Sequence, residues 1–207
     1  MSDKKNIIVV FRGSDDLKDW FANFQAVKDP GPLKDTKAHE GFQDALYPAV
    51  IKLTEIIDRF GANSKKIWVT GHSLGGALCS LYAGMLIENS YSIYGVYTFA
   101  SPRPGDESFA TALNTRVSGP HYRVVNTGDI VPHVPPEPFF SHAGKRIILK
   151  NNKKETSKKS WFSQRIMALK IFVKNTGNLF DAADNHRLSA DAESYIPRLI
   201  KDVARSR

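Results

Sequence analysis

The stretch Val-Thr-Gly-His-Ser-Leu-Gly-Gly-Ala-Leu at 69–78 decides the fold and contains the first candidate functional residue. It begins at the end of a run of strand-forming residues, 65–71, and leads into a helical pattern over 74–89. A serine between two glycines at a strand-to-helix turn has the G-x-S-x-G spacing, which lifts the hydroxyl clear of the sheet. The pattern predicts that Ser73 is a nucleophile. The alternative is a glycine-rich turn with a passive serine.

Strands and helices are predicted to alternate on both sides of this turn. The predicted strands begin at residues 7, 65, 94, 122 and 145, the predicted helices cover 14–24, 41–63, 74–89 and 107–117, and 29–38 is predicted to be a loop. This alternation is typical of an α/β fold, with a mainly parallel central sheet flanked by helices. With 207 residues, of which 42% are hydrophobic, we expect one domain over 1–207.

The net charge of +8 is concentrated in one segment of the chain. Between Lys145 and Lys174 there are ten Lys or Arg residues and one acidic residue, a charge of +9 that leaves −1 for the rest. Such a segment attracts lipid head groups or phosphate backbones. No recognised nucleic-acid-binding fold accompanies it, so we expect no nucleic-acid partner.

The N-terminal residues and the cysteine content bear on the cellular compartment in which the protein works. The single cysteine excludes an internal disulfide framework. The apolar run near the N-terminus has four residues, too few for a signal-peptide core or a membrane span. The sequence therefore predicts a cytoplasmic or peripheral-membrane location.

A nucleophilic serine needs an imidazole base and a carboxylate that holds the imidazole. In the order of the α/β-hydrolases the acid follows the serine and the base follows the acid. Asp129 comes at the end of a predicted strand, whereas Asp106 follows a Pro-Gly turn at the start of a helix, as an N-cap does. We therefore predict that Asp129 is the acid.

Three histidines follow this acid, His133, His142 and His186. His133 lies only four residues after Asp129, and His142 leads into a strand, which is typical of structural loop histidines. His186 precedes a terminal helix and is free to reach across the top of the sheet, so we predict it as the base. His72 is expected to point away from the serine. This mechanism needs no cofactor and no metal, and none is expected.

The oxyanion of an acyl transfer needs preorganised N–H donors, and loss of one costs about 3–4 kcal/mol. The N–H of Leu74 follows the nucleophile at a helix N-terminus and is one predicted donor. The second donor is expected from the loop after an earlier strand. The Arg-Gly-Ser turn at 12–14 supplies it through the N–H of Ser14, with its hydroxyl as a further candidate.

Taken together, these motifs resemble the class 3 lipases, the family of fungal triacylglycerol lipases. The resemblance runs from residue 7 to about 150, with His186 as a weaker last anchor, and rests on FRGS (11–14), VTGHSLGGAL (69–78), FASPRPGD (99–106), GDIVPHVPP (128–136) and HAG (142–144). It implies an α/β-hydrolase fold and the cleavage of lipid carboxylic esters through an acyl-enzyme. It also implies a catalytic triad of Ser73, Asp129 and His186 and an oxyanion hole formed by Ser14 and Leu74. These are the residues that chain order and local pattern selected above.

The resemblance further implies a lid helix over 14–25 that covers the serine in water. Four apolar residues there, Leu17, Trp20, Phe21 and Phe24, have the spacing that such a lid requires. The alternative is a permanently packed surface helix.

Two features depart from the family pattern. The chain begins at the strand before the oxyanion turn, so we expect a short N-terminal part and an uncovered sheet edge, which a homodimer would cover. The basic insertion 150–175 is predicted to dock on anionic lipid through Trp161, Phe162 and its lysines, and the alternative is a solvated basic loop.

Three functions remain open at the level of sequence. The first is a triacylglycerol lipase or esterase. The second is a phospholipase A-type acyl hydrolase at anionic membranes, which the basic insertion favours modestly. The third is a catalytically idle lipase-fold module that binds membranes or partners.

Overall fold

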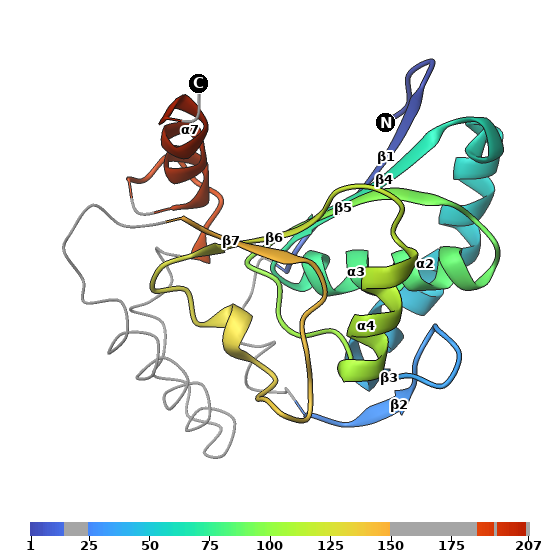
Figure 1. Ribbon diagram of the computed structural model, residues 1–207, viewed down its shortest axis with the longest axis horizontal. Coiled ribbons are helices and arrows are strands. Elements are labelled where there is room, and N and C mark those ends of the chain that lie inside the picture. Colours follow the sequence, from blue (N-terminus) through green and yellow to red (C-terminus); the bar gives the residue numbers. More distant parts are fainter. Residues whose placement is uncertain (15–24, 150–185, 193, 206–207) are drawn as a thin grey trace.

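A five-stranded parallel sheet forms the centre of the protein (Figure 1). The computed structural model describes residues 1–14, 25–149, 186–192 and 194–205, so nearly all of the predicted lid and the whole insertion 150–175 lie outside it. The strands are β1 (Asn6–Phe11), β4 (Lys66–His72), β5 (Ile93–Phe99), β6 (His121–Asn126) and β7 (Lys145–Leu149). Each pairs in parallel with its neighbour in the order β1-β4-β5-β6-β7, which confirms the predicted sheet.

Helices cover the sheet unequally on its two faces. On one face lie α2 (Glu40–Arg59), α3 (Leu74–Glu88) and α4 (Glu107–Arg116), and on the other α7 (Tyr195–Arg205) packs on the last strands (Figure 1). The alternation along β1 follows this arrangement. Ile7 and Val9 are buried in the core with α3, whereas Ile8 and Val10 are 36% and 58% exposed on the opposite face.

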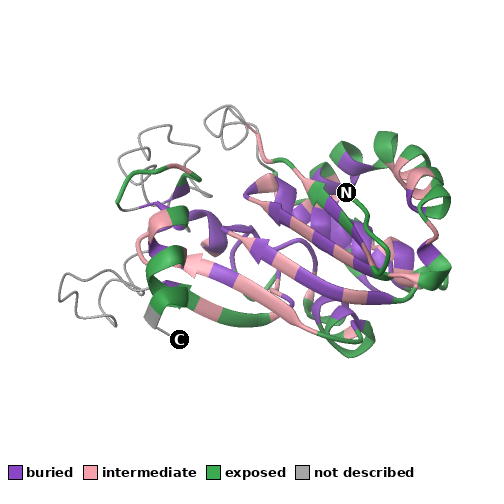
Figure 2. Cartoon of the chain, turned by 90° about the horizontal axis from the view of Figure 1, so that it is seen from above, coloured by how far each residue is buried: buried purple, intermediate pink, exposed green. Residues whose placement is uncertain are grey.

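The helix that follows Ser73 is the most deeply buried helix of the described residues. Its sequence, LGGALCSLYAGMLIE, has no polar face, and a helix that is apolar all round is buried on all sides. It packs against β1, β4 and β5 on one side and α2 on the other, within the buried centre that Figure 2 colours purple. The N-terminus of α3 is thereby held at the carboxyl ends of the strands, where the site lies.

One local prediction differs from the structure, and the predicted end of one helix is confirmed. Residues 29–38, predicted as a loop, include parts of a short antiparallel pair, β2 (Lys28–Pro30) and β3 (Lys37–His39), whose strands are too short to show a sequence periodicity. The helix predicted over 41–63, with Gly61 as its expected C-cap, ends at Arg59, two residues before that glycine. Gly61 follows with φ of 83°, a left-handed conformation that stops the helix, and a 3₁₀ turn, η1 (Ala62–Ser64), comes next.

The outer edge of β1 is paired at its start by the first residues of the chain. The N–H of Ile8 donates to the carbonyl of Met1 over 2.8 Å, and Ser2 bridges antiparallel to Ile7. The edge that was predicted to be uncovered is therefore partly paired. Among the described residues, no helix has both the length and the apolar character needed to cross a membrane.

Candidate active site

Ser73 lies alone between the end of β4 and the start of α3, where the backbone turns sharply. Its φ and ψ are 57° and −131°, a left-handed conformation that costs free energy for any residue with a side chain. The N–H of Ser73 donates to the carbonyl of Phe99 over 2.9 Å, and its own carbonyl accepts from Gly76 over 2.8 Å. The neighbouring strand and the first turn of α3 therefore hold the strained turn in place.

Two glycines beside Ser73 allow backbone segments to approach closely. A Cβ atom on Gly71 would lie 2.1 Å from the carbonyl oxygen of Gly75, and one on Gly75 would lie 2.3 Å from that of Phe11. Both distances are far below any normal contact with carbon. The glycines thus let α3 begin directly against β4 and β1, which places Ser73 at the carboxyl end of the sheet.

The three residues predicted as a triad are joined by hydrogen bonds. His186 Nε2 lies 2.8 Å from Ser73 Oγ, and His186 Nδ1 lies 3.0 Å from each carboxylate oxygen of Asp129. All three are buried, with 2%, 3% and 0% of their surfaces exposed for Ser73, His186 and Asp129. They come from the β4–α3 turn, the loop after β6 and the segment before α7, so chain order selected residues that the fold brings together.

The partners of His186 determine which nitrogen carries the proton when the ring is neutral. An ionised carboxylate only accepts hydrogen bonds, so Nδ1–H donates to Asp129. Nε2 then has a free lone pair and accepts from the hydroxyl of Ser73. This is the tautomer that a general base needs in order to remove the serine proton.

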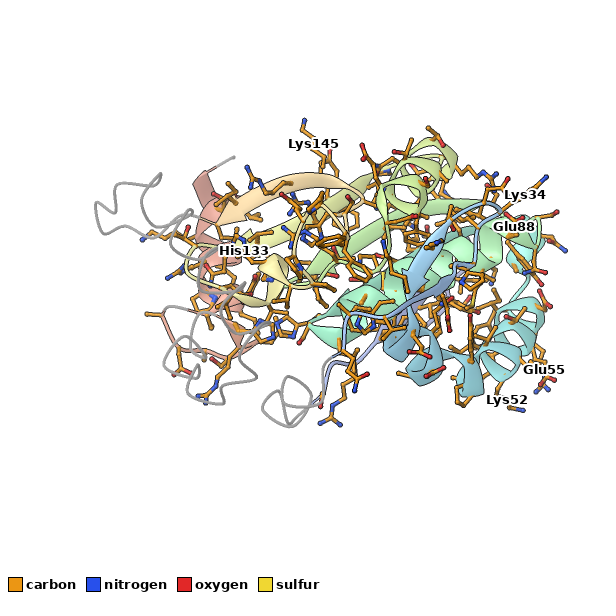
Figure 3. All side chains as sticks on the ribbon, turned by 90° about the horizontal axis from the view of Figure 1, so that it is seen from below. Lys34, Lys52, Glu55, Glu88, His133 and Lys145 are labelled. Carbon is orange, nitrogen blue, oxygen red and sulfur yellow. The ribbon has the colours of Figure 1, made fainter. Side chains whose placement is uncertain are left out.

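The alternative candidates have structural roles. Asp106 caps α4, because its carboxylate accepts from the N–H of Phe109 over 2.8 Å. His142 donates from Nε2 to the carbonyl of Pro132 over 2.7 Å. His133 belongs to the 3₁₀ turn η2 (Val131–His133), at the opposite end of the molecule from the exposed α2 side chains labelled in Figure 3. Of these candidates, only His186 bonds to both Ser73 and Asp129.

His72, which was predicted to point away from the nucleophile, contacts the backbone of the base. Its Nε2 lies 2.7 Å from the carbonyl oxygen of His186, and since a carbonyl only accepts, Nε2–H is the donor. Burial, and then the nearby ring of His186, lower the pKa of His72 to about 4. His72 is therefore neutral near pH 7 and restrains the backbone of His186.

The turn predicted to supply an oxyanion donor lies next to the nucleophile. A Cβ on Gly13 would be 2.8 Å from the carbonyl oxygen of His72 and 3.1 Å from Cβ of Ser73, so the 12–14 turn packs against this side of Ser73. Leu74 is the first residue of α3, and an N–H at that position has no acceptor within its own helix. The donor roles of Ser14 and Leu74 remain predictions.

Sequence reasoning missed two residues that contact the triad region from α7. The hydroxyl of Tyr195 donates to Oδ2 of Asp129 over 2.7 Å, and Arg198 donates to the Asn126 side chain and to the Thr127 carbonyl. The local sequence of α7 does not indicate these hydrogen bonds. They arise because α7 crosses the ends of β6 and β7, which only the tertiary structure reveals.

Buried histidines should make the protein lose stability in mild acid. Burial lowers the pKa of His39, His72 and His121 from 6.5 to about 4 each, and it lowers the pKa of His142 well below 6.5. The unfolded chain therefore binds more protons than the folded protein between about pH 6.5 and 4. This stability is full above pH 6.5 and decreases as the pH falls toward 4, by about 2.5 kcal/mol at pH 4.5 for each of the three histidines with a pKa of about 4.

Thermal unfolding at pH 7.5, 6.5, 5.5 and 4.5 measures this loss. We expect Tm to decrease with each step below pH 6.5. The variant for comparison is His121→Gln, because His121 lies away from the triad and its buried Nδ1 has no hydrogen-bond partner among the residues that the structure describes. The variant should show a shallower decrease in Tm, and identical curves for both proteins would contradict the assignment of this loss to buried histidines.

Comparison with known proteins identifies the family of this fold and site. The model of the family described as Lipase (class 3) matches residues 8–139. The chain is 40% identical to a lipase of Rhizomucor miehei over 163 residues, which are 74% of this chain and 44% of that protein. It is 34% identical to secreted mono- and diacylglycerol lipase 1 of Fusarium solani, with coverages of 66% and 41%. It is 26% identical to phospholipase A1-II 3 of Oryza sativa subsp. indica, with coverages of 70% and 42%.

Solved structures give the same result for the fold. The structure of Rhizomucor miehei triacylglyceride lipase superposes with a TM-score of 0.64 at 38% identity, over 72% of this chain and 59% of that one. A second structure, of a triacylglycerol lipase whose catalytic centre is described as a serine protease triad, has a TM-score of 0.62 at 35% identity, with coverages of 72% and 59%. The fold is therefore the α/β-hydrolase fold.

The comparisons contradict the cytoplasmic or peripheral-membrane location that the sequence predicted. Relatives from Fusarium solani and Malassezia globosa are named as secreted lipases. The prediction relied on the residues with which the chain begins. The prediction is wrong, because the chain spans less than half the length of the Rhizomucor miehei, Fusarium solani and Oryza sativa relatives, and its first residues are therefore no guide to a leader.

The family assignment rests on the agreement of three findings. The family model covers more than half of the chain, a relative is 40% identical over 74% of the chain, and a solved lipase has the same fold with a TM-score of 0.64. The chain therefore belongs to the class 3 lipases.

Proposed function

We propose that this protein is a serine hydrolase that cleaves the carboxylic ester bonds of lipids. Ser73 is the nucleophile, His186 the general base, and Asp129 the residue that orients His186. The observation that carries the proposal is the continuous hydrogen-bond series from Ser73 through His186 to Asp129, at 2.8 and 3.0 Å. The names of the relatives, which include lipases and a phospholipase A1, support lipid esters as the substrate class.

The reaction has two halves. In the first, Ser73 Oγ attacks the ester carbonyl carbon while His186 Nε2 takes the hydroxyl proton, and a tetrahedral oxyanion forms. When the carbon–oxygen bond to the alcohol breaks, His186 gives that proton to the departing oxygen, which leaves an acyl-enzyme on Ser73. In the second half, water gives a proton to His186, attacks the acyl carbon, and releases the carboxylic acid as Ser73 recovers its proton.

The proposed oxyanion donors are the N–H groups of Leu74 and Ser14. Leu74 lies at the N-terminus of α3, where the helix dipole also favours negative charge. The 12–14 turn lies against the other side of Ser73, as the close approach of Gly13 indicates. Together they would offer two donors to one oxygen, which is the arrangement that stabilises the tetrahedral intermediate.

An apolar cavity of about 610 Å³ beside this turn supports a lipid substrate. Its lining includes Gly13 and Ser14 together with the side chains of Phe11, Phe99 and Leu188. A cavity of this size and character accommodates an acyl chain within reach of the oxyanion turn.

Three sequence predictions about partners and access belong with this proposal. The lid over 14–25, with Leu17, Trp20, Phe21 and Phe24, would cover Ser73 until the protein meets a lipid surface. The insertion 150–175 would attach the protein to anionic lipid, and a homodimer would cover the sheet edge beyond Ile8. The lid side chains and the insertion lie outside the described residues, and the structure contains one chain. The lid, the lipid attachment and the homodimer therefore stay predictions.

Labelling with a fluorophosphonate tests the nucleophile directly. We expect one label per folded chain, located on Ser73 by mass spectrometry of the digested protein. Ser80 and Ser101 serve as internal controls, because their hydroxyls donate to the carbonyls of Gly76 and Pro102 instead of an imidazole. Heat-unfolded protein should take no label. A folded protein that takes no label would favour the idle-module alternative.

Hydrolysis assays then separate the two enzymatic alternatives. Acid release is measured with emulsified triacylglycerol and with vesicles of phosphatidylcholine containing phosphatidylglycerol. We expect faster release from triacylglycerol, because the chain is 38% and 35% identical to two solved triacylglycerol lipases and 26% identical to the phospholipase A1. Faster release from the vesicles would favour the phospholipase A alternative.

A further inference from the structure

A fully buried tyrosine on α7 contacts the carboxylate of the proposed triad. Tyr195 has 1% of its surface exposed, and its hydroxyl donates to Oδ2 of Asp129 over 2.7 Å. The same hydroxyl accepts from the backbone N–H of Asn126 over 2.9 Å. The Tyr195 hydroxyl therefore connects the end of β6 to the acid that follows it three residues later.

The carboxylate of Asp129 is enclosed by hydrogen-bond donors. Besides Tyr195, Oδ1 accepts from the N–H of Val131 over 3.0 Å, and both oxygens lie 3.0 Å from Nδ1 of His186. Asp129 has no exposed surface, so these donors take the place of water around its charge. Each donor also fixes the direction in which the carboxylate faces the imidazole.

Burial, and then the adjacent charge of Asp129, raise the pKa of Tyr195 well above 10. The phenol therefore keeps its proton throughout the pH range in which an ester hydrolase is assayed. Tyr195 remains a hydrogen-bond donor to the carboxylate under all of those conditions.

The helix that carries Tyr195 is anchored to the same strand end. Arg198, one turn further along α7, donates to the side chain of Asn126 and, over 3.2 Å, to the carbonyl of Thr127. Tyr195 also packs against Val124 and Leu149 of the sheet. The position of the hydroxyl relative to Asp129 is therefore set by several independent contacts.

We propose that Tyr195 is a positioning residue of the hydrolytic site, which holds the Asp129 carboxylate toward His186 and shares its negative charge. This inference rests on the proposed function. Tyr195 does not touch the reacting atoms and acts through Asp129. The phenol ring alone would fill the space between α7 and the sheet, so the two hydrogen bonds of the hydroxyl are what the inference concerns.

The test is Tyr195→Phe, which removes the hydroxyl and keeps the ring. We expect kcat to decrease about tenfold, with KM within about twofold, because a hydrogen bond to a charged group is lost and the carboxylate is less well oriented. The acid limb of the pH–rate profile should move to higher pH. With one donor fewer, more of the carboxylate charge acts on the positively charged imidazolium that forms during the reaction.

The matched control is Tyr82→Phe. Tyr82 is also fully buried, but its hydroxyl lies on α3 and contacts Thr54 over 3.4 Å, away from the triad. We expect kcat and the pH profile of this variant to match the wild type. Every kcat is calculated per active site, and the number of active sites is measured by titration with a fluorophosphonate. A variant that is partly unfolded then has fewer active sites, and its kcat per site can still be compared with that of the wild type.

A second measurement keeps the shape of the residue intact. Replacement of Tyr195 by 3-fluorotyrosine makes the phenol a stronger donor, so the acid limb should move to lower pH, opposite to the phenylalanine variant. If neither protein moves the acid limb and the kcat of Tyr195→Phe equals that of the wild type, the positioning role is wrong. An unlabelled, inactive wild type would instead refute the proposed function itself.

Discussion

Asp129→Asn is expected to lower kcat by about 10⁴-fold while substrate binding changes little. The carboxylate accepts from Nδ1–H of His186 and thereby selects the tautomer in which Nε2 is free to take the proton of Ser73. An amide group at residue 129 can donate to Nδ1 instead. The ring then carries its proton on Nε2, where it cannot remove a proton from Ser73.

The measurement is kcat and KM for a soluble ester, with Ser73→Ala as the reference for background hydrolysis. Asp106→Asn is the matched control, since Asp106 also follows a strand of the sheet but caps α4, and asparagine caps a helix as well as aspartate. We expect the control to keep wild-type activity. An Asp129→Asn variant within tenfold of the wild type would show that Asp129 does not orient the base.

Gly75→Ala is expected to destabilise the protein by at least about 3 kcal/mol, a decrease in Tm of about 10 °C. The added Cβ would lie 2.3 Å from the carbonyl oxygen of Phe11 and 2.8 Å from the carbonyl carbon of Arg12. These are backbone atoms of the β1 end and the oxyanion turn, so relief requires β1 or α3 to move. Such a movement breaks hydrogen bonds between β1 and β4 or displaces Ser73.

Gly41→Ala is the control for this substitution. Gly41, like Gly75, is the second residue of a helix, but its added Cβ would meet only the ring of His39 at 3.4 Å, an ordinary contact. Since alanine is the better helix former, Gly41→Ala should be neutral or slightly stabilising by thermal denaturation. Equal Tm values for the two variants would contradict the close approach at Gly75.

The site could be predicted from sequence wherever local pattern and chain order carry the information. Ser73 was identified by the strand, glycine and helix pattern around it, which the turn conformation requires. Asp129 and His186 followed from order along the chain and from their places at the ends of elements. The structure joins these three residues by hydrogen bonds, and it gives Asp106 and His142 the structural roles that their surroundings indicated.

The rest could not be predicted because it depends on contacts between segments far apart in the sequence. Tyr195 meets Asp129 only after α7 has packed across β6 and β7. The β2–β3 pair consists of three-residue strands, and one of them ends in Pro30, so composition alone indicates a loop. His72 was expected to pack, but its bond to the backbone of His186 depends on where the last segment lies.

The hydrogen bonds of the triad connect residues that are 57 and 113 positions apart, and the bond between Tyr195 and Asp129 spans 66. Contacts of such long range form slowly, because the chain must close large loops before they are made. A molecule with the five strands assembled and α7 undocked has a nucleophile in place and no base. Regain of catalytic activity during refolding would therefore mark the arrival of the final segment, so an ester assay on this protein also reports the completion of its fold.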